Sequence, residues 1–152
     1  SGQTLRGCSM IAVDPGERGA VARWTADGLA WVLPLDEGFL PAQALAELPG
    51  EVLIVELPGF ARDKASVSSA LAQGRNVGRV EAAGRILAER VVIVPAKTWR
   101  SVVGITGGTK PQKDAAGRIV LARLGVANAA KMRSGSIDAA LMAWAGFRGM
   151  IR

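Results

Sequence analysis

Short apolar runs dominate the first part of the chain, and longer helical repeats dominate the rest. Met10, Ile11 and Val13 have the pattern of a buried strand, which Asp14-Pro15-Gly16 ends. The apolar run at 52–55 is typical of a central strand covered on both faces. The pattern predicts strands at 9–14, 19–24, 29–33, 52–55 and 91–94. It predicts helices at 41–48, 66–90, 97–103, 109–124 and 136–147.

The order of these elements indicates the fold class. A hairpin turn at Asp27-Gly28 links the second and third strands, so the first three strands form an antiparallel meander. A helix separates each later strand from the one before it, as in parallel crossover connections. We therefore predict an α/β fold. Its five-stranded mixed sheet has three antiparallel strands, then two parallel ones, with helices on both faces.

The length of the chain suits one domain. We predict a single domain over 1–152, with 1–8 as a flexible tail. No run approaches the roughly 20 apolar residues that span a bilayer, and the N-terminus lacks the pattern of a signal peptide. We therefore expect no membrane partner and a cytoplasmic location.

The composition restricts the possible chemistry. The chain has no histidine and one cysteine, which excludes Ser-His-Asp and Cys-His catalysis and zinc sites built from imidazole or thiolate. A catalytic metal must therefore bind oxygen ligands, which suits magnesium or manganese. The net charge of +6 favours nucleic acid as a partner, although a solvated basic surface is the alternative. The segment 104–110 is not a Walker phosphate loop, so we expect no nucleotide cofactor.

Three acids lie at the ends of predicted apolar elements. Asp14 ends the first strand, Glu56 ends the fourth, and Asp138 lies in the first turn of the last helix. If the first and fourth strands are neighbours, Asp14 and Glu56 lie side by side, and the last helix can bring Asp138 to them. Such a cluster needs divalent cations to offset its repulsion. Two cations about 4 Å apart would stabilise the attacking and leaving oxygens of a phosphodiester.

Each acid also has a structural interpretation that the sequence leaves open. Asp14 can be a turn residue, Glu56 can pair with an arginine, and Asp138 can interact with the helix dipole. The tryptophans are interpreted mostly as core residues; they are Trp24, Trp31, Trp99 and Trp144.

Several motifs lie in order along nearly the whole chain: MIAVDPG at 10–16, VE at 55–56, PGF at 58–60, GRNVG at 74–78, PAKTWR at 95–100, VG at 103–104, KDAA at 113–116 and IDAAL at 137–141. They comprise an opening strand, a second acidic strand, a glycine-rich helix and a closing aspartate–alanine helix. Together they resemble the motifs of RuvC-type Holliday junction resolvases of the ribonuclease H-like superfamily, and the glycine-rich helix is similar to that of phage and bacterial relatives.

The resemblance implies a ribonuclease H-like fold and a specific activity. RuvC-like enzymes act as symmetric dimers and hydrolyse DNA strands at four-way junctions, with magnesium held by a carboxylate cluster. Asp14, Glu56 and Asp138 match three of those acids. We therefore expect two Mg²⁺ ions per site, replaceable by Mn²⁺, and products with 5′ phosphates. Lys113 matches the family lysine near the scissile phosphate and would offset its charge.

The sequence departs from the family at the fourth metal ligand. Relatives place a histidine or an acid shortly before the last aspartate, whereas this chain has Arg-Ser-Gly-Ser at 133–136. Ser134 or Ser136 can hold a water molecule there, and Glu17 and Asp114 are alternative acids. This departure leaves the second metal site and the activity open.

Basic residues near the glycine-rich loop 104–108 and the helix start at Thr109 fit contacts with DNA phosphates, because both features present backbone N–H groups. Phe60 resembles an aromatic that wedges into the junction centre, with ordinary packing as the alternative. For the lysines, a solvated helix face is the alternative. The predicted DNA-contacting residues are Phe60, Arg62, Lys64, Arg75, Arg79, Lys97, Arg100, Lys110 and Lys113.

Other functions remain open at this point. A junction-binding protein without catalysis would also explain the missing fourth ligand. A nuclease acting on flaps or RNA–DNA hybrids would share the fold. The sugar kinase and actin-like ATPase group shares the strand pattern, but the chain is too short for its two lobes. Gly74, Gly78 and Gly84 indicate close packing of the helix at 66–90, against the active-site wall or a dimer partner.

Overall fold

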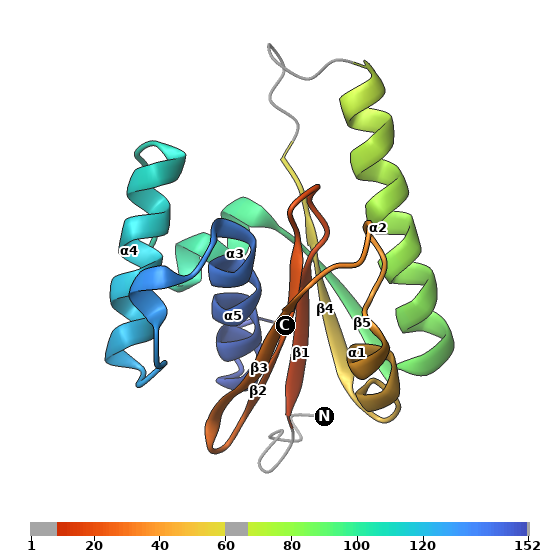
Figure 1. Cartoon of the computed structure of the whole chain (residues 1–152), viewed down its shortest axis with the longest axis horizontal. Helices are drawn as coiled ribbons and strands as arrows, with labels where there is room; N and C mark the ends of the chain where they lie inside the picture. The colour runs from red at the N-terminus through yellow and green to blue at the C-terminus, as the bar shows by residue number, and fades with distance from the viewer. Residues whose placement is uncertain (1–8, 60–66, 152) are drawn as a thin grey trace.

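The computed structural model describes residues 9–59 and 67–151, and the described residues form a five-stranded sheet between two layers of helices (Figure 1). The strand order is β3-β2-β1-β4-β5. The strands are β1 (Met10–Asp14), β2 (Ala20–Thr25), β3 (Gly28–Pro34), β4 (Val52–Leu57) and β5 (Arg90–Pro95). β1, β2 and β3 pair antiparallel, and β4 pairs parallel with both β1 and β5. The predicted mixed sheet is therefore confirmed.

The helices lie on both faces of the sheet. On one face lie α1 (Ala42–Glu47) and α2 (Val67–Leu87), and on the other lie α3 (Ala96–Val102), α4 (Lys110–Arg123) and α5 (Ser134–Phe147) (Figure 1). A short 3-10 helix, η1 (Ala129–Lys131), precedes α5. No helix in the described ranges is long and apolar enough to cross a membrane.

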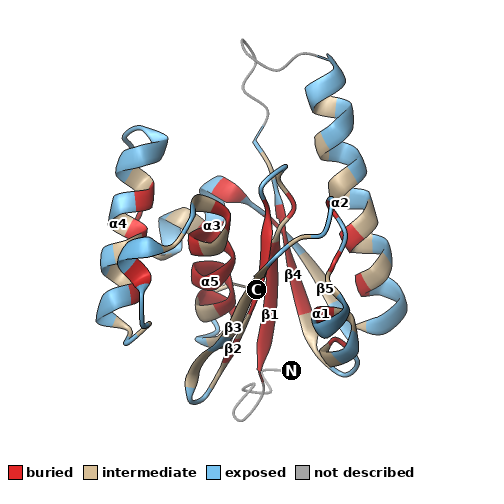
Figure 2. Cartoon of the chain, viewed as in Figure 1, coloured by how far each residue is buried: buried red, intermediate tan, exposed pale blue. Residues whose placement is uncertain are grey.

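β1 and β4 consist mostly of buried residues (Figure 2). Met10 and Ala12 of β1 belong to the core under α5, whereas Ile11 and Val13 belong to the core under α1 and α2. This alternation explains why the strand reads as a continuous apolar run. A Cβ built on Gly146 of α5 would lie 2.3 Å from Ile54 Cδ1, so the helix packs unusually close to the sheet.

The structure corrects three details of the sequence prediction. The helix predicted to reach residue 90 ends at Leu87, because Arg90 pairs with Val52 in β5. The last helix begins at Ser134, so Asp138 lies in its second turn, beyond the first turn in which the helix dipole acts strongly. The close packing predicted for the glycines of α2 is found at Gly84.

Gly84 is the glycine of α2 that packs against the sheet, since an added Cβ would lie 2.6 Å from a Leu53 methyl. Within the described part of the chain, no atom would lie within 4 Å of a Cβ added at Gly74 or Gly78. Gly74 and Gly78 therefore face open space among the described residues, and Figure 1 shows the start of α2 rising past the end of the sheet.

Candidate active site

The carboxyl ends of β1 and β4 bring two acids together, and α5 adds a third. Val13 and Val55 are register partners in these parallel strands, so Asp14 and Glu56, one residue further on, are neighbours. α5 packs across β1 and β2 and carries Asp138 to the same edge. One carboxylate oxygen of each acid lies within 4.8 Å of the other two. The predicted convergence is therefore found.

Two of these acids are nearly removed from solvent. Glu56 and Asp138 are each 5% exposed, and Asp14 is partly buried. The Trp99 indole N–H donates to Glu56 Oε2 at 2.6 Å, and the Gly16 backbone N–H donates to Asp14 Oδ1 at 3.0 Å. These hydrogen bonds fix the orientation of two carboxylates. The contact of Trp99 with Glu56 has no signal in the sequence, where Trp99 is interpreted as an ordinary core residue.

Burial and crowding make the cluster costly to ionise. Burial raises the pKa of Glu56 to about 8, and repulsion from Asp14 and Asp138 adds to the rise. Burial also raises the pKa of Asp14 to about 6, against the lowering effect of the hydrogen bond from Gly16. A divalent cation would reverse this balance, because it favours the charged carboxylates.

Two cations contact Asp138 directly. Arg100 Nη2 lies 3.1 Å from Asp138 Oδ2, and Lys110 Nζ lies 3.0 Å from the same oxygen. Lys110 Nζ also lies 3.2 Å from Oδ1 of Asp114, which is 9% exposed. Burial lowers the pKa of Lys110, but attraction from Asp138 outweighs it and the pKa is raised overall. Arg100 and Lys110 were predicted to contact DNA, and the structure places them against the carboxylates.

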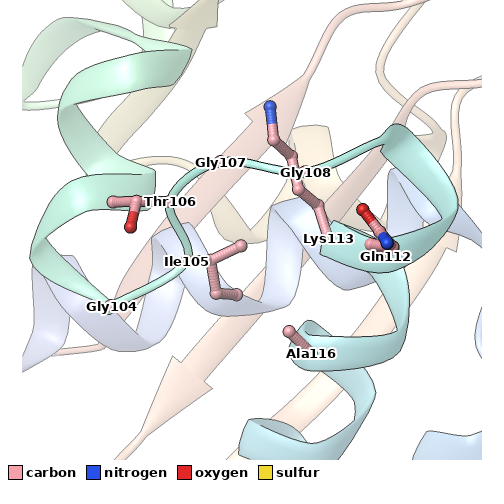
Figure 3. Close-up of a pocket in the computed structure, with 8 residues that line it drawn as sticks. All are labelled: Gly104, Ile105, Thr106, Gly107, Gly108, Gln112, Lys113 and Ala116. Carbon is pink, nitrogen blue, oxygen red and sulfur yellow. The ribbon is translucent and has the colours of Figure 1, made fainter.

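Lys113 points elsewhere. It lines a pocket of about 290 Å³ between the loop 104–108 and the start of α4, together with Gln112 and Ala116 (Figure 3). The side chain runs from α4 along the glycine-rich loop. Lys110, three residues earlier, contacts Asp114 and Asp138.

The start of α5 explains the missing fourth ligand. Residues three and four positions before Asp138 share its helix face, and these are Gly135 and Ser134. A Cβ on Gly135 would lie 2.3 Å from the Arg18 carbonyl oxygen, so the turn after β1 excludes any side chain there. The Ser134 hydroxyl donates to Asp114 Oδ1 at 3.1 Å.

Three other residues were candidates for the fourth ligand: Glu17, Ser136 and Asp114. Glu17 is exposed, and Ser136 is partly buried. Asp114 is the alternative acid that the structure brings near the cluster, through its contact with Lys110.

The other predicted DNA-contacting residues are scattered. Arg75 and Lys97 are exposed, as a phosphate contact requires. The Arg79 guanidinium lies 4.3 Å from the centre of the Phe39 ring and donates to the Glu37 carbonyl at 3.3 Å, so it holds the turn before α1 against α2. Three further predicted residues lie outside the described ranges; they are Phe60, Arg62 and Lys64.

Comparison with known proteins bears on the fold. No protein-family model matches the sequence, and a search of curated proteins gives no match. A structure of T. thermophilus RuvC in complex with a Holliday junction substrate matches with a TM-score of 0.62 and 16% identity. The match covers 93% of this chain and 95% of that chain. The chain has the RuvC fold. A second Thermus thermophilus RuvC structure matches with a TM-score of 0.62 and 18% identity, covering 95% of this chain and 98% of that one.

The fold match and the acidic cluster are both consistent with the motif resemblance. The motif resemblance is confirmed at the level of the fold, since the matched structures span nearly the whole chain. Two carboxylates at the carboxyl ends of β1 and β4 and a third in the second turn of α5 form a set of oxygen ligands. Such a set can hold a divalent ion.

Proposed function

We propose that this chain is a metal-dependent endonuclease that resolves four-way DNA junctions and leaves 5′ phosphates. The observation that carries the proposal is the buried cluster of Asp14, Glu56 and Asp138 at one edge of the sheet. Acids are brought together in this way at a high cost in repulsion, which a bound cation removes. A fold shared with a protein solved on a Holliday junction supports the substrate class.

The chain's own residues prepare the site for a metal and a phosphate. Asp14, Glu56 and Asp138 would hold Mg²⁺ or Mn²⁺, which supplies Lewis-acid stabilisation of a phosphodiester. Trp99 and Gly16 hold two of the carboxylates in place before any ion binds. Because the pKa of Glu56 is about 8, this carboxyl would have to give up a proton near neutral pH to hold a divalent ion.

Basic residues would hold the DNA backbone near the cluster. Lys113 lines the pocket beside the glycine-rich loop, while Arg75 and Lys97 are exposed on other parts of the surface. Contacts of this kind release counterions, so affinity for a junction should fall steeply as salt rises. Junction binding that is insensitive to salt would contradict this part of the proposal.

A symmetric dimer is part of the same proposal, because resolution requires two cuts. The surface that suits pairing is the exposed early part of α2. Val67 is 79% exposed and Leu71 is 65% exposed, and Gly74 and Gly78 follow them along the same side of the helix. Exposed apolar side chains beside residues without side chains allow two helices to approach closely. Such an enzyme would act on DNA in the cytoplasm of a bacterial or phage-infected cell.

One observation favours a second candidate, a protein that binds junctions without cutting them. Arg100 and Lys110 already neutralise Asp138, and Gly135 supplies no fourth ligand. A chain with these features can bind DNA and lack cleavage.

A cleavage assay separates these functions. A labelled four-way junction is incubated with the protein and Mg²⁺ or Mn²⁺, and the cut positions and their 5′ ends are mapped. Flap and RNA–DNA hybrid substrates run in parallel test the related nuclease activities. We expect paired cuts in the junction that Asp14→Asn removes while binding persists. Binding without cuts in either metal would establish the second candidate, and full activity of Asp14→Asn would refute the proposed site.

A further inference from the structure

The ammonium group of Lys110 sits between two buried carboxylates. Its Nζ atom lies 3.0 Å from Asp138 Oδ2 and 3.2 Å from Asp114 Oδ1, and these acids are 5% and 9% exposed. Asp138 is also a member of the proposed metal cluster, whereas Asp114 lies outside it. Lys110 therefore occupies the point where a second cation, shared by Asp138 and Asp114, would have to bind.

The surrounding chain reinforces this arrangement. The Ser134 hydroxyl donates to the same Asp114 oxygen that Lys110 contacts, at 3.1 Å. The position after Ser134 has no side chain and no room for one, because the Arg18 carbonyl oxygen fills the space beside Gly135. The helix face that carries Asp138 thus offers a serine committed to Asp114 and a glycine, but no further carboxylate.

The charges around the site match one divalent ion. Four carboxylates are involved, those of Asp14, Glu56, Asp138 and Asp114, and they carry four negative charges when ionised. Arg100 and Lys110 supply two positive charges. One divalent ion balances the remainder, and a second would leave two uncompensated positive charges in a largely buried site.

We infer that this chain binds a single divalent cation and that the Lys110 ammonium, held by Asp114 and Asp138, takes the place of the second. This inference rests on the proposed function, and it replaces the two-ion expectation drawn from the family resemblance. Asp114 and Ser134 are then positioning residues, because they act by placing Lys110. The ammonium is a positive charge fixed to the chain beside the proposed metal site, so it does not dissociate as a second bound ion would.

Counting bound Mn²⁺ tests the inference without measuring activity. Titration calorimetry and electron paramagnetic resonance at pH 8 should find one tight Mn²⁺ per chain in the unmodified protein. Lys110→Met keeps the length of the side chain and removes its charge, and it should admit a second Mn²⁺. Adding Asp114→Asn to Lys110→Met should return the count to one, because the second ion loses a ligand.

Matched variants control the count. Lys113→Met removes a lysine three residues further along the same helix, and its count should stay at one. A chain with both Asp14→Asn and Asp138→Asn gives the background of weak surface binding, and circular dichroism verifies folding of each variant.

Each alternative outcome has a definite meaning. Two tight ions in the unmodified protein would overturn the inference and leave the proposed nuclease intact. No tight ion would overturn the proposed metal site and the inference together. One ion in both the unmodified protein and Lys110→Met would show that Lys110 does not take the place of a second ion.

Discussion

The two ends of the central sheet both gather carboxylates, but they treat the charge in opposite ways. At the amino ends of β1 and β4, Arg23 bridges Glu47 and Glu51, and Trp31 donates to Glu47 at 3.2 Å. Partial burial would raise the pKa of Glu47, but the hydrogen bonds from Trp31 and Arg23 outweigh it, so the pKa of Glu47 is lowered. At this end the acids are matched by donors already present in the fold.

At the carboxyl ends of the same strands, each acid also has a donor, but burial and crowding prevail. Glu56 has a raised pKa although Trp99 donates to it, because burial and two neighbouring carboxylates outweigh that hydrogen bond. The comparison teaches how to separate a structural cluster of acids from a functional one. In a structural cluster the donors of the fold lower the pKa of an acid, whereas in a functional cluster the pKa values stay raised and a bound cation would favour the charged carboxylates.

The largest effect expected from this contrast is on cleavage. Glu56→Gln should lower junction cleavage by about 100- to 1,000-fold, the range for loss of one transition-state contact, while the free energy of unfolding does not fall. Glu47→Gln, at the opposite end, should leave cleavage within a factor of about two, since it lies far from the reacting phosphate. Single-turnover cleavage and urea unfolding measure the two quantities. Equal losses of cleavage in both variants would remove the distinction between the ends.

The next effect is on stability, and it is expected at the amino ends of β1 and β4, where substitution should leave cleavage nearly unchanged. Arg23→Met should lower the free energy of unfolding by about 2 kcal/mol, because Glu47 and Glu51 are left partly buried without their cation. Arg85→Met breaks the exposed pair with Glu81 and serves as the control, with an expected loss of less than about 0.5 kcal/mol. Urea unfolding at pH 7 measures both. Similar values for the two variants would show that the Arg23 network adds no more than a surface pair.

The dependence of stability on pH should reveal the raised pKa values of Asp14 and Glu56 directly. Glu56 has a pKa of about 8 in the folded protein, against an ordinary value of 4.5, so between these limits the folded state binds the extra proton. The stabilisation is fully present below pH 4.5 and is lost as pH rises through 8. The corresponding stabilisation from Asp14 is lost as the pH rises from 3.8 to about 6. The metal-free protein should therefore become less stable as the pH rises from 5 to 9.

Thermal unfolding at several pH values checks this dependence. Glu56→Gln should flatten the decline above pH 6, because the titrating group is gone. Millimolar Mg²⁺ should offset the decline at pH 8 to 9, since the ion binds the ionised cluster of the folded state. Stability of the metal-free protein that rises from pH 6 to pH 9 would have the wrong sign for a cluster with raised pKa values.

Most of the fold could be predicted from the sequence because its determinants are local. The apolar runs of β1 and β4 and the turn residues after them indicate strands wherever they occur. The acids Asp14 and Glu56 stand out because each ends such a run, and Asp138 because it interrupts an apolar helix. The sequence alone leaves the pairing of β1 with β4 open, and the structure supplies it.

The partners of the acids could not be predicted, because they depend on which side chains meet across elements distant in sequence. Lys110 and Lys113 lie on one helix, three residues apart, and the motif resemblance favoured Lys113. The structure places Lys110 at the acids, since it shares a face of α4 with Asp114 and Gly117, and Gly117 packs against α5. The exclusion of a side chain at Gly135 likewise depends on the Arg18 backbone, more than a hundred residues earlier in the chain.

Replacing Trp99, the hydrogen-bond donor to Glu56, should have the smallest effect of these changes. It tests whether this donor at the carboxyl ends of β1 and β4 has a functional role. Trp99→Phe keeps an aromatic ring in this fully buried position and removes the N–H that donates to Glu56. Loss of a hydrogen bond to a metal-ligating group weakens metal binding or activity by about 10- to 100-fold, and we expect the lower part of this range because Glu56 keeps its packing. The free energy of unfolding should fall by about 1 kcal/mol. Trp24→Phe, in the same core but distant from the cluster, is the matched control. If both variants lose stability alike and neither changes Mn²⁺ affinity, Trp99 is only a core residue and the orientation of Glu56 must come from burial alone.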